Sequence, residues 1–426
     1  MKNWIKTYEP YFIFVLLFTF FIIVAFAFND TAQLMEDLIS IITSRSVLIT
    51  DYIAEGSIGA TLLNVAIVGG ITTFLLIFEK IKPDGAVIMG LWLTIGFAFF
   101  GKNIFNMIPI TFGVWLCAKI QKEPFEKYVI IAMLSATVSP IVSEVAFLEQ
   151  GYLIVNIILG ILVGILTGII FPFLSAFCTR IHDGYMLYNL GFAGGIISLI
   201  FLSVLRAFDI DIEPKNDWST GNNLSLSVLI FVICLSFIIY GLKQHGLKKV
   251  KSNLIAMTKH SGRLATDYYN MFGASSYVNV GILGIIGTLV VIVLRGDING
   301  PTIAGIFCIM GFGFFGKNLK NVPPIMIGAI ACSIVNPLAV TAPSNILAIL
   351  FGTGLAPIAG KYGFVWGVVA GFMHVNLVLH VGILSRGVNL YNNGFVAGFV
   401  ALFLVPIING LIHVYHEQIR PRMKAR

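Results

Sequence analysis

A lysine and two asparagines occur twice in the same apolar setting. Residues 96–110 read GFAFFGKNIFNMIPI and residues 311–325 read GFGFFGKNLKNVPPI, so ten of the fifteen positions agree at a separation of 215 residues. A charged side chain between apolar runs is costly and generally has a function. Lysine supplies positive charge, and asparagine amides supply hydrogen-bond donors and acceptors. This combination favours binding of an anion or of a neutral solute that accepts hydrogen bonds.

Two half-sites are therefore predicted, one from each copy. The substrate-binding candidates are Phe99, Phe100, Lys102, Asn103 and Asn106 in the first copy and Phe314, Phe315, Lys317, Asn318 and Asn321 in the second. In the alternative interpretation, the two lysines extend to opposite headgroup regions and the asparagines cap helix ends. The sequence leaves both interpretations open.

Three further polar residues lie in a later apolar run, at 362–384. Asn376 and His380 are four residues apart and share a helix face, and His374 precedes them. A histidine titrates near physiological pH, so the three residues are candidates for a proton relay. The alternative is a histidine that hydrogen-bonds to a neighbouring helix.

Two pairs of repeated motifs have weaker implications. The segments SATVSPIVS around Pro140 and TGLAPIAG around Pro357 are typical of kinked or broken helices, whose free carbonyl groups can bind a cation such as sodium. The pattern LYNxGFxxG begins at Leu187 and again at Leu390. Its tyrosines either line a vestibule or lie at the membrane interface, and its glycines allow tight helix packing.

No catalytic arrangement is evident in the sequence. It has no HExxH motif, no GxSxG in a strand–turn–helix context, no Walker loop and no dinucleotide fingerprint. The five cysteines are isolated and predict neither a disulfide framework nor a metal site. We therefore expect a protein that is not an enzyme and that needs no cofactor or metal.

The composition indicates what positions these residues. Of the 426 residues, 58% are hydrophobic and only 11% are charged, whereas soluble proteins carry about a quarter charged residues. Apolar runs long enough to span a bilayer recur along the whole chain, so the sequence predicts an all-α integral membrane protein. The net charge of +7 is attributed to basic cytoplasmic loops and not to nucleic-acid binding.

The duplication extends over nearly the whole chain and divides it into 1–223 and 224–426. Each repeat should hold about six to seven hydrophobic segments, including a pair of short, re-entrant or thinly spanning helices at the GKN motif. Matched loops carry opposite charge: residues 29–59 are mainly acidic, and residues 243–277 are mainly basic. By the positive-inside rule, the two repeats have inverted topology, and both termini are cytoplasmic.

The duplicated GFxFFGKNxxNxxPI and LYNxGFxxG segments resemble those of a bacterial family of integral membrane proteins known only as a domain of unknown function, over most of the chain. More loosely, the two inverted halves resemble urea-channel-type proteins and the membrane subunits of sodium-pumping quinone reductases. The aquaporin Asn-Pro-Ala pair is absent, and residues 57–61 match a flavin-attachment motif only poorly. These resemblances imply no substrate and transfer no site residues.

Inverted repeats usually place a substrate pathway between the two halves, near the middle of the membrane. We expect a secondary transporter or channel for a small polar or anionic solute in the bacterial cytoplasmic (inner) membrane. Its expected partners are the lipid bilayer and a small-molecule or ion substrate, with homo-oligomerisation left open and no nucleic acid. The alternative is a membrane subunit of a larger complex, with or without a redox role, that has no transport activity of its own.

Overall fold

The two halves of the chain fold into the same succession of helices. The structure is a computed structural model that describes residues 7–415, except residues 48, 214, 265 and 382–385. The first half contains α2 (Glu9–Phe28), α3 (Thr31–Thr43), α4 (Tyr52–Glu55), α5 (Ile58–Phe78), α6 (Gly85–Phe97), α7 (Ile104–Ile120), η1 (Phe125–Tyr128), α8 (Val129–Ser135), η2 (Ala136–Val138), α9 (Pro140–Ala146), α10 (Leu153–Ile181) and α11 (Asn189–Ala207). The second half contains α12 (Asn223–Met257), α13 (Tyr268–Phe272), α14 (Ser275–Val293), α15 (Gly300–Gly313), α16 (Val322–Val335), α17 (Pro343–Gly352), η3 (Thr353–Leu355), α18 (Ala356–Tyr362), α19 (Phe364–Val381) and α20 (Asn392–Val414).

The predicted all-α membrane fold is confirmed. Nine helices within the described ranges are long and apolar enough to cross a bilayer, and a tenth span is formed if the bent pair around Pro140 is counted as one. That pair changes direction by 47° at the proline, as expected of a broken helix. The helices α6, α7, α15 and α16 are shorter, and they are the paired helices predicted around the two GKN motifs.

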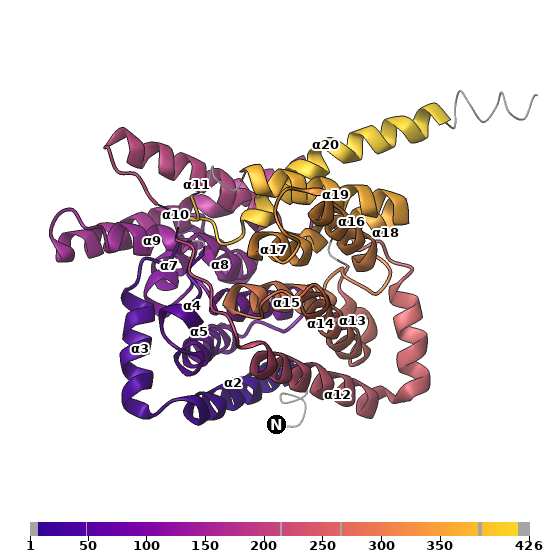
Figure 1. Ribbon diagram of the computed structural model, residues 1–426, viewed down its shortest axis with the longest axis horizontal. Coiled ribbons are helices and arrows are strands. Elements are labelled where there is room, and N and C mark those ends of the chain that lie inside the picture. Colours follow the sequence, from indigo (N-terminus) through magenta and orange to yellow (C-terminus); the bar gives the residue numbers. More distant parts are fainter. Residues whose placement is uncertain (1–6, 48, 214, 265, 382–385, 416–426) are drawn as a thin grey trace, which may run out of the picture.

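The first long segment of each half ends in a helix that turns away from the span. In the first half this helix is α3, which begins at the side-chain cap of Asp30 and buries Leu34, Leu38 and Ile41. In the second half the chain continues without a break in α12 but kinks at Gly246, whose φ of 71° favours glycine. Figure 1 shows α3 and the last part of α12 standing at opposite ends of the molecule. The two halves are therefore inverted relative to each other.

Equivalent helices of the two halves meet at the centre of the molecule. Helix α6 packs against α15, and α11 packs against α20. The α11–α20 contact is close, because a Cβ atom added to Gly191 would lie 3.0 Å from the Cα atom of Gly394. The last helix of each half thus contacts its own counterpart, which places the repeat interface along a pseudo-twofold axis.

One acidic residue of the first half lies inside the molecule. Glu144 belongs to α9, and its side chain is completely buried. Its Oε2 atom accepts a hydrogen bond from Nη2 of Arg45 at 2.7 Å. The helix continues beyond Pro140 and carries the carboxylate inward, where the guanidinium group compensates its charge.

Candidate functional site

In each GKN motif, a tight turn joins two short helices. In the first half, Gly101 has a φ of 74°, and a Cβ atom there would lie 2.3 Å from Leu390 of the other half. After the turn, the side chain of Asn103 accepts a hydrogen bond from the backbone of Asn106, and Asn106 returns the same contact at 2.9 Å. These reciprocal bonds form a capping box that starts α7.

The second half repeats this turn. Gly316 has a φ of 103°, and Asn318 and Asn321 exchange the equivalent bonds at 2.8 and 3.1 Å. A further asparagine closes each turn from the preceding span. Asn64 donates to the carbonyl groups of Ala98 and Lys102, and Asn279 donates to those of Gly313 and Lys317. The amides of the motif thus hold the backbone at both breaks; they cap the helix that follows in the first half, whereas α16 begins after Asn321 without a side-chain cap.

The four predicted phenylalanines belong mainly to the packed core. Phe99 contacts Phe21 and Phe307 edge to face, and Phe314 contacts Tyr277 in the same way. Phe100 is buried, and Phe315 is partly buried against the core. Their aromatic rings stabilise contacts between helices and do not line the pocket described below.

Both lysines are completely buried, which excludes the headgroup alternative for their side chains. Neither forms an ion pair with a carboxylate in the part of the chain that the structure describes. Their hydrogen bonds differ, however. Lys317 Nζ donates to the hydroxyl of Tyr188 at 2.5 Å and to that of Thr353 at 2.8 Å. Lys102 Nζ has one acceptor, the carbonyl oxygen of Met133, at 3.3 Å.

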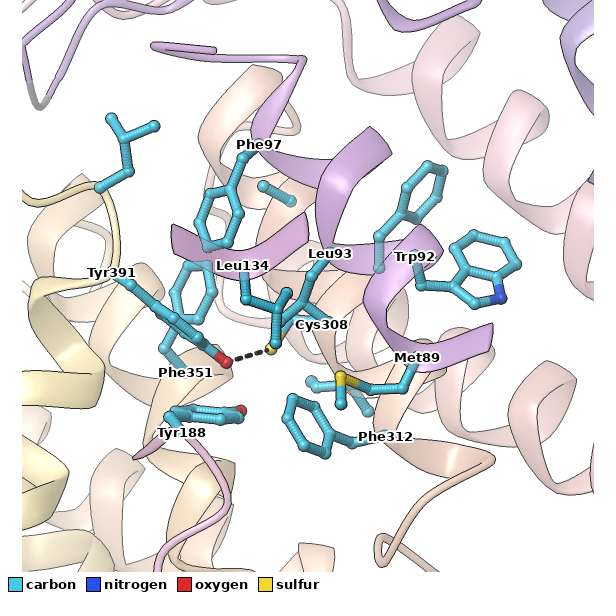
Figure 2. Packing of buried hydrophobic residues seen from close by; sticks show 14 of the residues in the cluster. Met89, Trp92, Leu93, Phe97, Leu134, Tyr188, Cys308, Phe312, Phe351 and Tyr391 are labelled. Atoms are coloured by element: carbon cyan, nitrogen blue, oxygen red, sulfur yellow. Dashed lines mark hydrogen bonds between the residues drawn. The ribbon is translucent and has the colours of Figure 1, made fainter. Parts of the chain in front are cut away.

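A column of aromatic side chains separates the two lysines. The rings of Tyr188 and Tyr391 lie 4.6 Å apart across the repeat interface, and each is flanked by a phenylalanine, Phe312 or Phe97, at 5.1 Å. Figure 2 shows this packing together with the hydrogen bond between Tyr391 and Cys308. The two tyrosines are buried and lie at the centre of the protein, not at a membrane interface. The two half-sites are therefore joined by packed rings.

Lys102 lines a pocket of about 380 Å³ between α5, α7 and α8. Its lining is apolar apart from Lys102 and three threonines, Thr72, Thr94 and Thr111. The exposed side chains Phe74, Ile108 and Phe112 form part of the wall. Phe74 lies on the membrane-spanning candidate α5, and Ile108 and Phe112 lie on the apolar helix α7, so we infer that the pocket opens sideways towards the hydrocarbon of the bilayer. Lys317 is not among its lining residues.

The three proton-relay candidates do not form a continuous set. His374 is buried, and its Nε2 atom lies 3.0 Å from Oδ1 of Asn393 on the next helix. Asn376 and His380 lie on the exposed face of α19, and the Asn376 amide donates to the carbonyl of Phe372. The arrangement of His374 corresponds to the alternative of a histidine that hydrogen-bonds to a neighbouring helix.

Two aspartates connect the halves in a way that the sequence did not reveal. Asp51 accepts hydrogen bonds from the backbone of Ser219 and Gly300, and Asp267 accepts one from Gly85. Gly300 and Gly85 begin α15 and α6, so a carboxylate of each half accepts a hydrogen bond from the first N–H group of a short helix in the other half, beside that helix's own N-cap residue. The only sequence signal was the repeated Thr-Asp-Tyr, which gives no indication of the partner.

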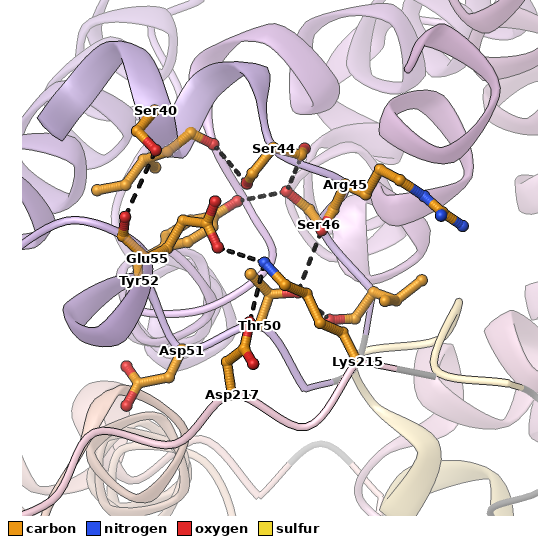
Figure 3. Close-up of polar contacts among 12 residues, drawn as sticks. Ser40, Ser44, Arg45, Ser46, Thr50, Asp51, Tyr52, Glu55, Lys215 and Asp217 are labelled. Atoms are coloured by element: carbon orange, nitrogen blue, oxygen red, sulfur yellow. Dashed lines mark hydrogen bonds and ion pairs between the residues drawn. The ribbon is translucent and has the colours of Figure 1, made fainter. Parts of the chain in front are cut away.

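Asp51 lies in a polar cluster outside the spanning helices (Figure 3). In this cluster, Lys215 of the connection between the halves forms ion pairs with Glu55 and, at 2.9 Å, with Asp217. Burial raises the pKa of Asp51 to about 6, although its bonds to backbone N–H groups oppose the shift. The Lys215–Glu55 ion pair thus holds the connection between the halves against the short segment that contains Asp51, whose side chain hydrogen-bonds to the start of α15.

Residues 30–207 and 247–410 match a protein family described as protein of unknown function (DUF1576). The chain belongs to this family. The two matched segments fall in the two halves and omit α2 and the first part of α12. No curated protein and no solved structure matched the chain.

Proposed function

We propose that this protein is a secondary transporter or channel for a small polar or anionic solute, located in the bacterial cytoplasmic membrane with both termini cytoplasmic. The observation that carries this proposal is Lys102, a buried cation that lines a pocket and has a single long hydrogen bond to the protein. A buried charge is costly unless it is paired, so an uncompensated one is expected to serve binding.

The surrounding architecture supports the same proposal. Inverted repeats with interrupted helices are a common design of secondary transporters, whose substrate sites lie at the breaks between half-helices. In this protein, both breaks carry a lysine, and the glycine of each break lies close to a leucine of the opposite half, Leu390 or Leu187, just before that half's last helix. A movement of one half relative to the other would therefore shift the residues that contact both breaks.

Solute flux in proteoliposomes that contain this chain alone tests the proposal. We expect uptake of a small radiolabelled anion such as acetate, and at least a tenfold loss of uptake in Lys102→Met. The matched control is Lys122→Gln, which changes an exposed lysine in the loop after α7 and should leave uptake unchanged. Uptake equal to that of empty liposomes would reject the proposal, and flavin absorbance in the purified protein would favour a redox subunit instead.

A further inference from the structure

Lys102 and Lys317 occupy equivalent positions in the two halves, so the surroundings of one can be compared with those of the other. Lys102 is preceded by the same residues as Lys317, and the helices α8 and α17 that face them occupy equivalent places in the two halves. With the prolines Pro140 and Pro357 matched, Met133 corresponds to Leu350 and Ala136 corresponds to Thr353. Differences between the two surroundings therefore reflect divergence at a site that was once the same.

The decisive difference is a hydroxyl group. In the second half, Thr353 donates to the carbonyl of Leu350 at 2.6 Å and accepts from Lys317, so it connects the ammonium group to the helix. In the first half, Ala136 provides no hydroxyl, and Lys102 reaches the carbonyl of Met133 directly. The second acceptor is also missing. Tyr391, the counterpart of Tyr188, directs its hydroxyl to Cys308 instead.

Lys317 is thus compensated by the protein, whereas Lys102 keeps unused donors beside an open pocket. An ammonium group has three N–H donors, and one 3.3 Å contact leaves the others for a ligand. The charge favours an anion, and the space is at the small end of ligand pockets. The lateral opening between exposed apolar side chains favours a molecule that is itself dissolved in the bilayer.

We propose that the pocket between α5, α7 and α8 binds a single-chain amphiphilic anion, with its headgroup at Lys102 and its apolar tail along Phe74, Phe112 and Trp115. This assignment deepens the proposed function and rests on it as far as transport is concerned. A fatty-acid-like carboxylate has the required chemistry, since it is a compact monoanion with one chain. Thr94 shares the carbonyl of Met133 with Lys102 and so lies near the charged end, and most of the other lining residues are aliphatic or aromatic.

A direct binding experiment uses the tryptophan in the wall of the pocket. The full chain is placed in nanodiscs of zwitterionic phosphatidylcholine and titrated with a bromine-labelled undecanoate, which quenches tryptophan fluorescence on contact. We expect a saturable component of quenching that is lost in Trp115→Phe. Lys102→Met should weaken binding at least tenfold, and Lys102→Arg should restore it to within about threefold. Equal binding by wild type and Lys102→Met would overturn the assignment.

The comparison of the two lysines provides the sharper variant. Ala136→Thr introduces the hydroxyl that serves Lys317 in the other half, so it should engage Lys102, occupy part of the pocket and weaken binding about fivefold or more. Lys317→Met changes the lysine that is already compensated and should leave the affinity of the pocket unchanged. Gel filtration establishes that each variant is folded. Unchanged binding in Ala136→Thr, or loss of binding only in Lys317→Met, would contradict the proposal.

Two further comparisons distinguish a failure of the binding site from a failure of the transport function and identify a two-chain lipid as occupant. If nanodiscs of anionic phosphatidylglycerol abolish probe binding, the occupant is a two-chain lipid and the single-chain assignment is wrong. If acetate uptake depends on Lys102 but the undecanoate probe does not bind, the proposed function holds and this inference fails. If the probe binds through Lys102 but acetate uptake equals that of empty liposomes, the binding site holds and the transport function fails.

Discussion

At the scale of single residues, the duplicated motif has separated into structural and functional parts. The asparagine side chains hydrogen-bond to the backbone of the turn, and Lys317 donates hydrogen bonds to Tyr188 and Thr353. Lys102 alone combines burial, a pocket and incomplete hydrogen bonding. Hydrogen bonds to a charged group contribute roughly 1.5–3 kcal/mol each, so the missing acceptor is a substantial cost.

Asp51 gives the protein a predictable response to pH. Its pKa in the folded protein is about 6, above the ordinary value of 3.8, so folding favours the protonated form. The resulting stabilisation is fully present below about pH 4 and is lost as the pH rises through 6; a shift of this size corresponds to roughly 3 kcal/mol. We expect the melting temperature to fall between pH 5 and pH 7, and Asp51→Asn to flatten this dependence.

Thermal unfolding in detergent across this pH range measures the effect. Asp267→Asn is the matched control, because it removes the equivalent carboxylate from the other half. Parallel pH profiles for the wild type and Asp51→Asn would show that Asp51 is not the titrating group.

At the scale of the elements, glycines determine how closely neighbouring helices pack. A Cβ atom on Gly113 of α7 would lie 2.2 Å from the carbonyl oxygen of Ile165 on α10. The equivalent position in the second half, Gly328 of α16, would bring a Cβ atom to 1.9 Å from the carbonyl of Val368 on α19. Backbone lies against backbone at both crossings, and this is the packing by which small residues associate membrane helices.

Gly113→Ala should therefore separate α7 from α10 and lower the free energy of unfolding by roughly 1–3 kcal/mol, the usual cost of overpacking. Gly70→Ala is the matched control, since a Cβ atom there meets nothing within 4 Å and alanine favours the helix. Melting temperatures of the two variants in the same detergent test this prediction. A loss of similar size in both variants would contradict the prediction, because Gly70→Ala leaves the α7–α10 contact intact.

At the scale of the whole molecule, the two halves depend on each other. The first residue of α15 donates a hydrogen bond to Asp51, which lies 249 positions earlier, and the first residue of α6 donates one to Asp267. Each half thus supplies a structural part of the other half's hairpin. The two halves are therefore expected to fold as one unit despite the clear internal repeat.

Inverted topology can be tested by chemical labelling. Thr43 at the end of α3 and Ile255 near the end of α12 are exposed and occupy corresponding places in the two halves. With the basic side inside, Thr43→Cys should react with an impermeant maleimide in intact cells, and Ile255→Cys should react only after permeabilisation. The native cysteines are all buried, so their background should be low. Labelling of both positions from one side would contradict the inverted arrangement.

The sequence by itself determined the membrane class, the long spans, the broken helix at Pro140 and the pairing of equivalent segments. These features depend on local composition, which any stretch of about 20 apolar residues displays without its neighbours. Helix capping by the asparagines was one of two alternatives that the sequence left open, and the structure shows it for Asn103 at the start of α7.

Only the tertiary structure shows that Lys102 makes one hydrogen bond to the protein and Lys317 makes two. The partners of Lys317 come from positions 129 and 36 residues away, and Tyr391 is diverted from the first half-site by Cys308. No local pattern records such contacts, since the two copies of the motif are nearly identical around both lysines. The two lysines differ because of residues that are distant in the sequence. Tyr188 and Thr353 accept hydrogen bonds from Lys317, whereas Lys102 faces the pocket between α5, α7 and α8.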